Sequence, residues 1–186
     1  MLQYSDLSHD DLEETIKLYE THLNSGGEIR FWLREGFDNP LYCGVKCTDG
    51  DKMVGMFSVR PGIVFTYHNE ELAKQIGERW SGPELFTIDM VVVLPEYRRR
   101  GIARELLKRL HGRIVEKGGR RLLVEAWFRA EDSTAPLYGL LDEYFKKTEV
   151  VGKFDNFYKD LGKHGIACPE CGSSCKCGAI VFIVEF

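Results

Sequence analysis

Apolar residues along this chain recur with two spacings, and segments of the two kinds alternate from one end to the other. Continuous apolar and β-branched runs predict strands, whereas apolar residues three and four positions apart predict helices with one buried face. The strands predicted in this way cover residues 2–7, 41–47, 53–59, 88–94, 121–128, 149–158 and 179–186. The predicted helices follow Ser8, cover 28–36 and 69–77, follow Ala103, and follow a cap at Asp132 or Ser133. This alternation predicts an α/β protein.

The segment from Thr87 to Ala103 joins a buried strand to an amphipathic helix through a basic turn. Residues 88–94 are apolar except for Asp89, which is typical of a strand buried on both faces. Pro95 ends this strand, and Gly101 leaves no side chain where the backbone turns into the helix. Backbone N–H groups and the positive end of a helix therefore meet at one point, and such a point binds phosphate.

A second buried strand, residues 121–128, follows the helix. Two strands joined by one helix form a βαβ unit, so these strands are predicted to be parallel with a right-handed crossover. The Asp49-Gly50 pair between residues 41–47 and 53–59 predicts an antiparallel hairpin. The sheet is therefore predicted to be mixed.

Composition limits the classes of protein to which the chain can belong. Its 186 residues suit a single domain spanning 1–186, and its formal net charge of -4 argues against nucleic acid as the main partner. No apolar run approaches the ~20 residues that span a bilayer, and the N-terminus lacks the pattern of a signal peptide. We therefore expect a cytoplasmic protein with no membrane partner, and the sequence is compatible with a homodimer.

The basic turn carries a family resemblance. Six consecutive residues fit the pattern R-x-x-G-x-A and follow Pro95-Glu96-Tyr97: Arg98, Arg99, Arg100, Gly101, Ile102 and Ala103. This segment resembles the acyl-CoA pyrophosphate loop of the GNAT superfamily of N-acetyltransferases. The predicted order of strands and helices is similar to the GNAT fold. The resemblance implies a mixed, mostly antiparallel sheet flanked by helices, with the parallel βαβ unit at the acyl-CoA site.

The same resemblance implies how acetyl-CoA is held. Backbone N–H groups from Arg99 to Ala103 would bind the pyrophosphate, and the side chain of Arg98 with its neighbours would add positive charge. The backbone of Val91 and Val93 would pair with the pantetheine arm like an extra strand. Residues 67–82 lie where family members usually have a short link, so this segment resembles an insertion.

Two residues are candidates for catalysis. Glu125 is a carboxylate in an otherwise apolar strand, where burial raises a carboxyl pKa toward the range that a general base needs. It also occupies the position of a glutamate used as base by some ribosomal-protein acetyltransferases of the superfamily. Tyr138 matches the family tyrosine that protonates the departing thiolate. Two alternatives stay open: Asp89 as the base with Glu125 structural, and Tyr138 packed with its hydroxyl bonded locally.

A cysteine-rich segment, residues 164–178, lies between the last two predicted strands and contains Cys168, Cys171, Cys175 and Cys177. Its start, C-P-E-C-G, resembles the knuckle of zinc ribbons. Four thiolates near one point bind zinc in a closed site of structural type, with His164 as an alternative ligand to one cysteine. An iron-sulfur cluster and disulfides fit a reducing compartment less well. Cys43 and Cys47 are predicted to be two buried thiols.

Three classes of function follow. The first is the acetyl-CoA-dependent transfer of an acetyl group to a primary amine, on a small molecule or a protein, by direct attack in a ternary complex. The second is a non-catalytic acyl-CoA-binding regulator, and the third is a protein-interaction module built on the zinc-binding loop. The sequence does not identify the amine acceptor.

Overall fold

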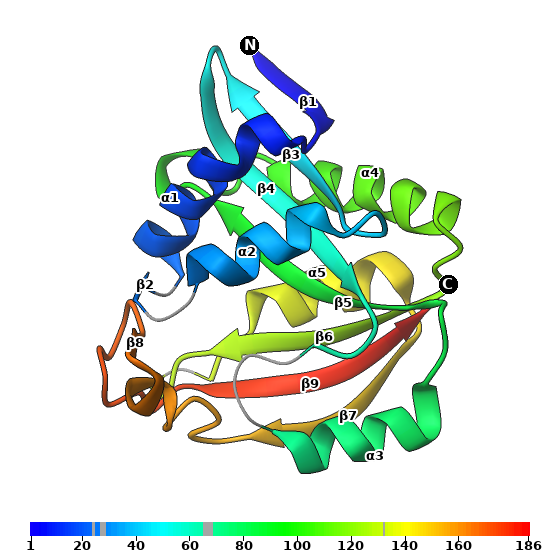
Figure 1. The fold of residues 1–186 in the computed structure, drawn as a ribbon, viewed down its shortest axis with the longest axis vertical. Coiled ribbons are helices and arrows are strands. Elements are labelled where there is room, and N and C mark those ends of the chain that lie inside the picture. Colours follow the sequence, from blue (N-terminus) through cyan, green and yellow to red (C-terminus); the bar gives the residue numbers. More distant parts are fainter. Residues whose placement is uncertain (24, 27–28, 65–68, 132) are drawn as a thin grey trace.

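The computed structural model describes residues 1–23, 25–26, 29–64, 69–131 and 133–186, and a seven-stranded sheet lies at its centre. Its strands lie in the order β1, β3, β4, β5, β6, β9, β7 (Figure 1). Their bounds are β1 Leu2–Asp6, β3 Cys43–Asp49, β4 Lys52–Pro61, β5 Leu85–Val93, β6 Arg121–Phe128, β7 Thr148–Phe154 and β9 Gly178–Glu185. β5 and β6 are parallel and the other neighbouring pairs are antiparallel, so the predicted mixed sheet is confirmed.

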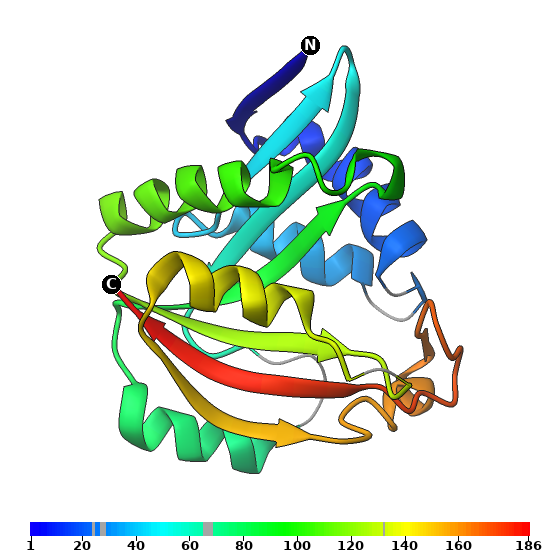
Figure 2. The same ribbon diagram turned by 180° about the vertical axis from the view of Figure 1, so that it is seen from behind.

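Helices cover both faces of the sheet. Their bounds are α1 Leu12–His22, α2 Ile29–Asp38, α3 Glu70–Trp80, α4 Ile102–Glu116 and α5 Pro136–Phe145. α1 and α2 lie over one face, which we call the front face, and α4 and α5 lie over the opposite, back face (Figures 1 and 2). α3, which arises from the segment that resembles an insertion, packs its apolar side against β6 and β9 on the front face.

Alternation along β6 divides the apolar interior into two clusters. Leu122, Val124 and Ala126 belong to the cluster that includes the buried residues of α4. Leu123 belongs to the second cluster, with the buried residues of α3 and of the cysteine-rich segment, and Trp127 packs against this cluster. Because successive side chains of a strand point to opposite faces, Glu125 shares the front face with Leu123 and Trp127.

Short elements complete the fold. The 3-10 helices among the described residues are η1 His9–Asp11, η2 Pro95–Tyr97 and η3 Leu161–His164. A second, two-stranded sheet pairs β2 Ser25–Gly26 with β8 Ile166–Ala167. The apolar pattern does not predict this sheet, because strands of two residues are too short to show a period.

The structure corrects several predicted boundaries. β5 begins at Leu85, before the predicted start of the strand, and β7 ends at Phe154 because the chain turns at Asn156, whose φ is 55°. Ser133 does not cap α5. The N-cap is Ala135, since Pro136 takes the first helical position that its fixed φ favours. The alternative cap Asp132 and the apolar residues 65–67 lie outside the described residues.

Candidate active site

The two parallel strands at the centre of the sheet separate soon after they meet. β5 and β6 pair at three positions, ending at Thr87 with Leu123. Opposite β4, the register shifts between Ser58 and Val59, which leaves Asp89 as the extra residue of a bulge in β5. A bulge bends its strand, and beyond it β5 turns away from β6 (Figure 2). The facing edges of the two strands, including Val91 and Val93 on β5, are therefore available to an extended ligand.

The basic turn stands at the end of β5 and leads into α4. Arg99 and Gly101 both have left-handed backbone conformations, with φ of 62° and 79°. Gly101 is the N-cap of α4, and a Cβ atom built on it would meet no protein atom within 4 Å. The first N–H groups of a 15-residue helix therefore open onto free space beside Gly101. The position where the sequence predicts a phosphate group is therefore open.

Two of the three arginines also brace the turn. Arg98 donates from Nε to the carbonyl oxygen of Val93 at 3.0 Å, and Arg100 donates to that of Glu96 at 2.8 Å. The guanidinium of Arg100 also lies over the ring of Tyr97, 5.0 Å from its centre. All three arginines are exposed, so the turn carries three solvent-accessible positive charges. Ile102 is buried in the core, which leaves its backbone N–H as its contribution to a phosphate site.

Glu125 lies on the front face of β6 and accepts a hydrogen bond of 2.6 Å from the hydroxyl of Tyr158. Tyr158 is buried. The pKa of its phenol is raised well above the ordinary value, mainly by burial and secondly by the charge of Glu125. Tyr158 therefore remains a donor at neutral pH. The sequence places Tyr158 in a strand and gives no sign of this contact, because the two residues are distant in the chain.

Asp89, the alternative base, has another role in the structure. Its carboxylate side chain is fully buried and pairs with Nε of Arg60 at 2.7 Å. Arg60 also donates to the carbonyl oxygen of Trp32 at 2.7 Å and stacks over the Trp32 ring. Burial raises the pKa of Asp89, and Arg60 opposes that shift. The pair thus connects β5 to α2, and its carboxylate offers no surface to an incoming amine.

Tyr138 lies in the first turn of α5, on the back face of the sheet. Its ring meets the ring of Phe182 edge-on, with centroids 5.0 Å apart. Phe182 is paired with Val124 on β6, whereas Glu125 is paired with Val181, so Tyr138 and Glu125 lie on opposite faces. A ligand that pairs with the facing edge of β5 would thus have Glu125 on one face of the sheet and Tyr138 on the other.

The four cysteines predicted as ligands come together. Sγ of Cys171 lies 3.9 Å from that of Cys168, 3.9 Å from that of Cys175 and 3.4 Å from that of Cys177. All four sulfur atoms lie within 4.8 Å of one another, close to the roughly 3.8 Å edges of a tetrahedron with ~2.3 Å zinc–sulfur bonds. Among the described residues, His164 is not part of this group.

Backbone geometry around the cysteines also fits thiolates. Cys168 and Gly172 exchange two backbone hydrogen bonds of 3.0 and 2.9 Å around the first turn. The backbone N–H of Lys176 donates to the sulfur of Cys171 and lowers the pKa of that thiol. Burial raises the pKa of Cys175, and that of Cys177 to about 11, so the positive charge of a metal ion would be needed to keep these two sulfur atoms deprotonated. The proximity of the four sulfur atoms favours a tetrathiolate metal site over four unrelated thiols. Cys43 and Cys47 lie in β3 and are buried, as predicted.

A comparison with protein families decides the identity of the fold. The model of the acetyltransferase (GNAT) family matches residues 6–139, which is most of the chain. The chain belongs to this family. As a GNAT protein, it carries the family's acetyltransferase domain from η1 through the start of α5, including the basic turn.

Solved structures agree on the fold. The ribosomal-protein-S18-alanine N-acetyltransferase of Escherichia coli has a TM-score of 0.64 and 17% identity, over 100% of this chain and 94% of that one. NAA60 of Arabidopsis thaliana, solved with acetyl-CoA, has a TM-score of 0.65 and 14% identity, over 100% and 99%. YncA of Salmonella typhimurium, solved with acetyl-CoA, has a TM-score of 0.61 and 11% identity, over 100% and 94%.

No curated protein matches the chain. Within the described residues, none of the helices has both the length and the apolar character needed to cross a membrane. GNAT membership supports N-acetyltransferase activity at the level of the family, and acetyl-CoA is bound in the structures of two of the relatives named above.

Proposed function

We propose that this GNAT protein transfers the acetyl group of acetyl-CoA to a primary amine, on a small molecule or a protein, by direct attack in a ternary complex. The observation that carries the proposal is the separation of β5 from β6, with the N-terminus of α4 and three exposed arginines at its end. Acetyl-CoA fits this arrangement, because pantetheine needs an open strand edge and pyrophosphate needs backbone donors and positive charge.

The end of β5 and the turn that follows it would bind the cofactor. N–H groups from Arg99 to Ala103 would hold the pyrophosphate, with Arg98 and Arg100 adding charge around the turn that they brace. The backbone of Val91 and Val93 would pair with the pantetheine arm. Acetyl-CoA supplies the thioester, whose carbonyl carbon receives the amine.

The residues on the two faces would divide the proton transfers. Glu125, on the front face, would accept the proton that the attacking amine loses as the carbon–nitrogen bond forms. Tyr138, on the back face, would donate a proton to the sulfur as the carbon–sulfur bond breaks. The two roles require acceptor and cofactor to approach from opposite sides of the sheet, which the positions of Glu125 and Tyr138 support.

The four cysteines would hold a zinc ion of structural type. Four sulfur ligands close the coordination shell and leave no position for a substrate, so the ion would stabilise structure and would not activate the amine. A reducing compartment such as the cytoplasm would keep the thiols available for metal.

Turnover on a panel of amines tests the proposal. Release of free CoA from acetyl-CoA should depend on an acceptor amine, and the product should carry one acetyl group. Tyr138→Phe should lower kcat while leaving the Kd for CoA nearly unchanged, because the lost hydroxyl acts on the departing sulfur. Tight CoA binding without turnover on a wide panel of small amines and peptide N-termini would instead favour the non-catalytic regulator.

A further inference from the structure

The four cysteines are joined to the acceptor side of the proposed site by contacts that the sequence does not reveal. β8 ends directly before Cys168 and pairs with β2, which lies between α1 and α2. In this pairing a Cβ atom built on Gly26 would lie 2.3 Å from the carbonyl oxygen of Gly165. The two segments therefore touch backbone to backbone, and their contact leaves no room for a side chain at Gly26.

A second connection runs through Tyr158 to the proposed base. Tyr158 belongs to the same buried cluster as Cys168 and Cys175, and, after burial and the charge of Glu125, the charge of Cys175 contributes to the raised pKa of its phenol. Its hydroxyl donates to Glu125 at 2.6 Å. Tyr158 thus links the buried cluster around the cysteines to the carboxylate of Glu125.

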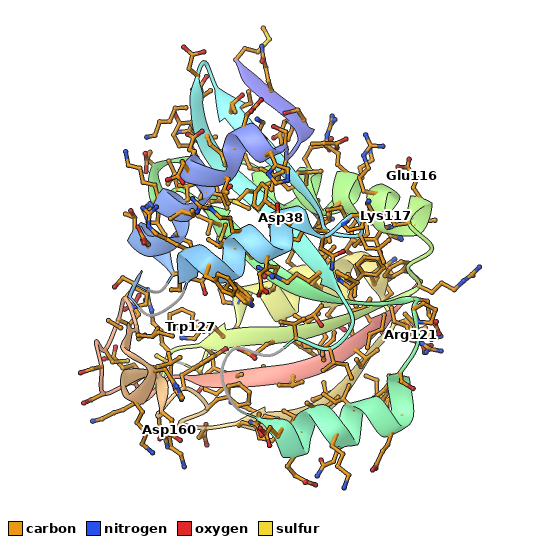
Figure 3. All side chains as sticks on the ribbon, viewed as in Figure 1. Asp38, Glu116, Lys117, Arg121, Trp127 and Asp160 are labelled. Atoms are coloured by element: carbon orange, nitrogen blue, oxygen red, sulfur yellow. The ribbon has the colours of Figure 1, made fainter. Side chains whose placement is uncertain are left out.

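A third connection lies at the end of β6. Glu170, inside the turn between the first two cysteines, pairs with Arg129 at 2.7 Å. In Figure 3, Trp127 and Asp160 lie at the same end of the sheet, where the cysteine-rich segment folds back. The segment thus pairs with β2 and with Arg129 at the end of β6, and it shares a buried cluster with Tyr158, the hydrogen-bond donor to the proposed base.

We propose that a metal ion bound by Cys168, Cys171, Cys175 and Cys177 holds the acceptor side of the active site in place, independently of CoA binding. The inference rests on the proposed function, because it takes from it that the acceptor amine binds on the front face. Between β7 and β9 the described chain has η3 and the two-residue β8 as its regular structure, so a metal crosslink would supply much of its order. The basic turn and α4 belong to the other half of the sheet and do not depend on this crosslink.

The first test compares purified protein with and without its metal. Elemental analysis should find about one zinc ion per chain. Removing it with a chelator should accelerate hydrogen exchange by about tenfold or more in peptides that contain residues 25–26 and 158–178. The Kd for CoA should change by less than about twofold, while the KM for an acceptor rises by about tenfold or more. Cys171→Ser should match the chelated protein, and Cys43→Ala, at a buried cysteine in β3, should match the untreated one.

A second variant tests the connection without touching a metal ligand. Gly26→Ala places a Cβ atom against the Gly165 carbonyl and should separate β2 from β8. We expect the same loss of exchange protection in residues 25–26 and the same rise in acceptor KM, with zinc content and CoA affinity retained. Gly50→Ala is the matched control, because Gly50 also has a positive φ, 61°, but its Cβ would meet nothing within 4 Å.

The outcomes separate this inference from the proposed function. Substoichiometric zinc, unchanged exchange after chelation, or loss of CoA binding together with the metal would each overturn the inference. Metal content, exchange and CoA affinity need no acceptor, so an absence of turnover on every amine would contradict the proposed function and leave the exchange result to decide the inference.

Discussion

Gly101 is the residue on which the shape of the basic turn depends most directly. Its φ of 79° is unfavourable for residues with a side chain, and the space beside it is open. Gly101→Glu would put a carboxylate where the pyrophosphate must approach. We expect the Kd for CoA to rise by about tenfold or more, measured by calorimetry on folded protein.

Gly118 provides the matched control for this change, at the other end of α4. Its φ is 83°, and its Cβ would also meet nothing within 4 Å. Gly118→Glu should therefore cost a similar backbone strain, about 1–2 kcal/mol of stability, and leave the CoA affinity unchanged. If the two variants bind CoA with equal affinity, the pyrophosphate does not bind at the turn around Gly101.

The hydrogen bond from Tyr158 to Glu125 makes a prediction about pH dependence. A donor favours the ionised form of a carboxylate, so Tyr158→Phe should raise the pKa of Glu125. A base with a raised pKa is protonated at higher pH, and the acidic limb of the kcat/KM profile should therefore move to higher pH. The profile of Glu125→Gln should lose this limb altogether, together with most of the rate.

A structural role for Tyr158 alone would give a different result. In that case the rate would fall by the same factor at every pH, and the limb would stay in place. Measuring both variants across the profile with one acceptor distinguishes the two, because a general loss of folded protein cannot move a titration.

The start of α1 is held by one carboxylate that serves two elements. The backbone N–H of Ser8 donates to Asp11 at 2.8 Å, and Lys46 of β3 donates to the same carboxylate. Burial tends to raise the pKa of Asp11, but the bonds from Lys46 and Ser8 outweigh it and lower the pKa below its usual 3.8. Asp11 therefore connects the helix start to the sheet.

Asp11→Asn should lower the free energy of unfolding by about 1–2 kcal/mol at neutral pH, as loss of a cap and of a charged hydrogen bond does. Since the pKa is lowered in the folded state, this contribution is present above pH 3.8 and is lost as pH falls through the folded pKa. Denaturant unfolding should thus show wild type and variant converging in acid. Asp10 is the exposed neighbour of Asp11, and Asp10→Asn should leave the free energy of unfolding unchanged both at neutral pH and in acid.

Periodicity predicts those elements whose burial is continuous along the chain. β6 and α4 were predicted at nearly their observed bounds because each buries a regular set of apolar side chains. Contacts between distant segments produce no periodic pattern in the sequence. The sequence therefore predicted neither the pairing of Arg60 with Asp89 nor the β2–β8 sheet. The sequence shows Arg60 next to Pro61 and Gly62 and so suggests a turn or a bulge, whereas the structure places Arg60 in β4, with its guanidinium bonded to the carbonyl oxygen of Trp32 in α2.

The candidate site also has parts that the sequence predicts and parts that it does not. The spacing of the four cysteines was enough to predict that they meet, because ligands within one short segment can come together through local turns. The basic turn was predicted for the same reason. The placement of Glu125 and Tyr138 on opposite faces needed the register of β6 with β9, which sequence spacing does not determine.

Among neighbouring strands of the sheet, β5 and β6 share the fewest residue pairs, and the ligand would bind where they separate. Three residue pairs hold β5 to β6, whereas β6 and β9 share eight and β3 and β4 share seven. A CoA molecule between β5 and β6 would bridge the two halves of the molecule. Ligand that binds the native state stabilises it, by about 2.7 kcal/mol when its free concentration is ~100 times the Kd.

We therefore expect the melting temperature to rise with CoA concentration, and hydrogen exchange to slow most in residues 88–93 and 124–128, which flank the gap. Gly101→Glu should remove both effects at the same CoA concentration, while Gly118→Glu retains them. Stabilisation by CoA with exchange slowed evenly across the molecule, or confined to residues away from the gap, would place the ligand elsewhere. The distinction follows from the topology, because no strand in the described part of the chain pairs with these edges of β5 and β6 and could slow their exchange.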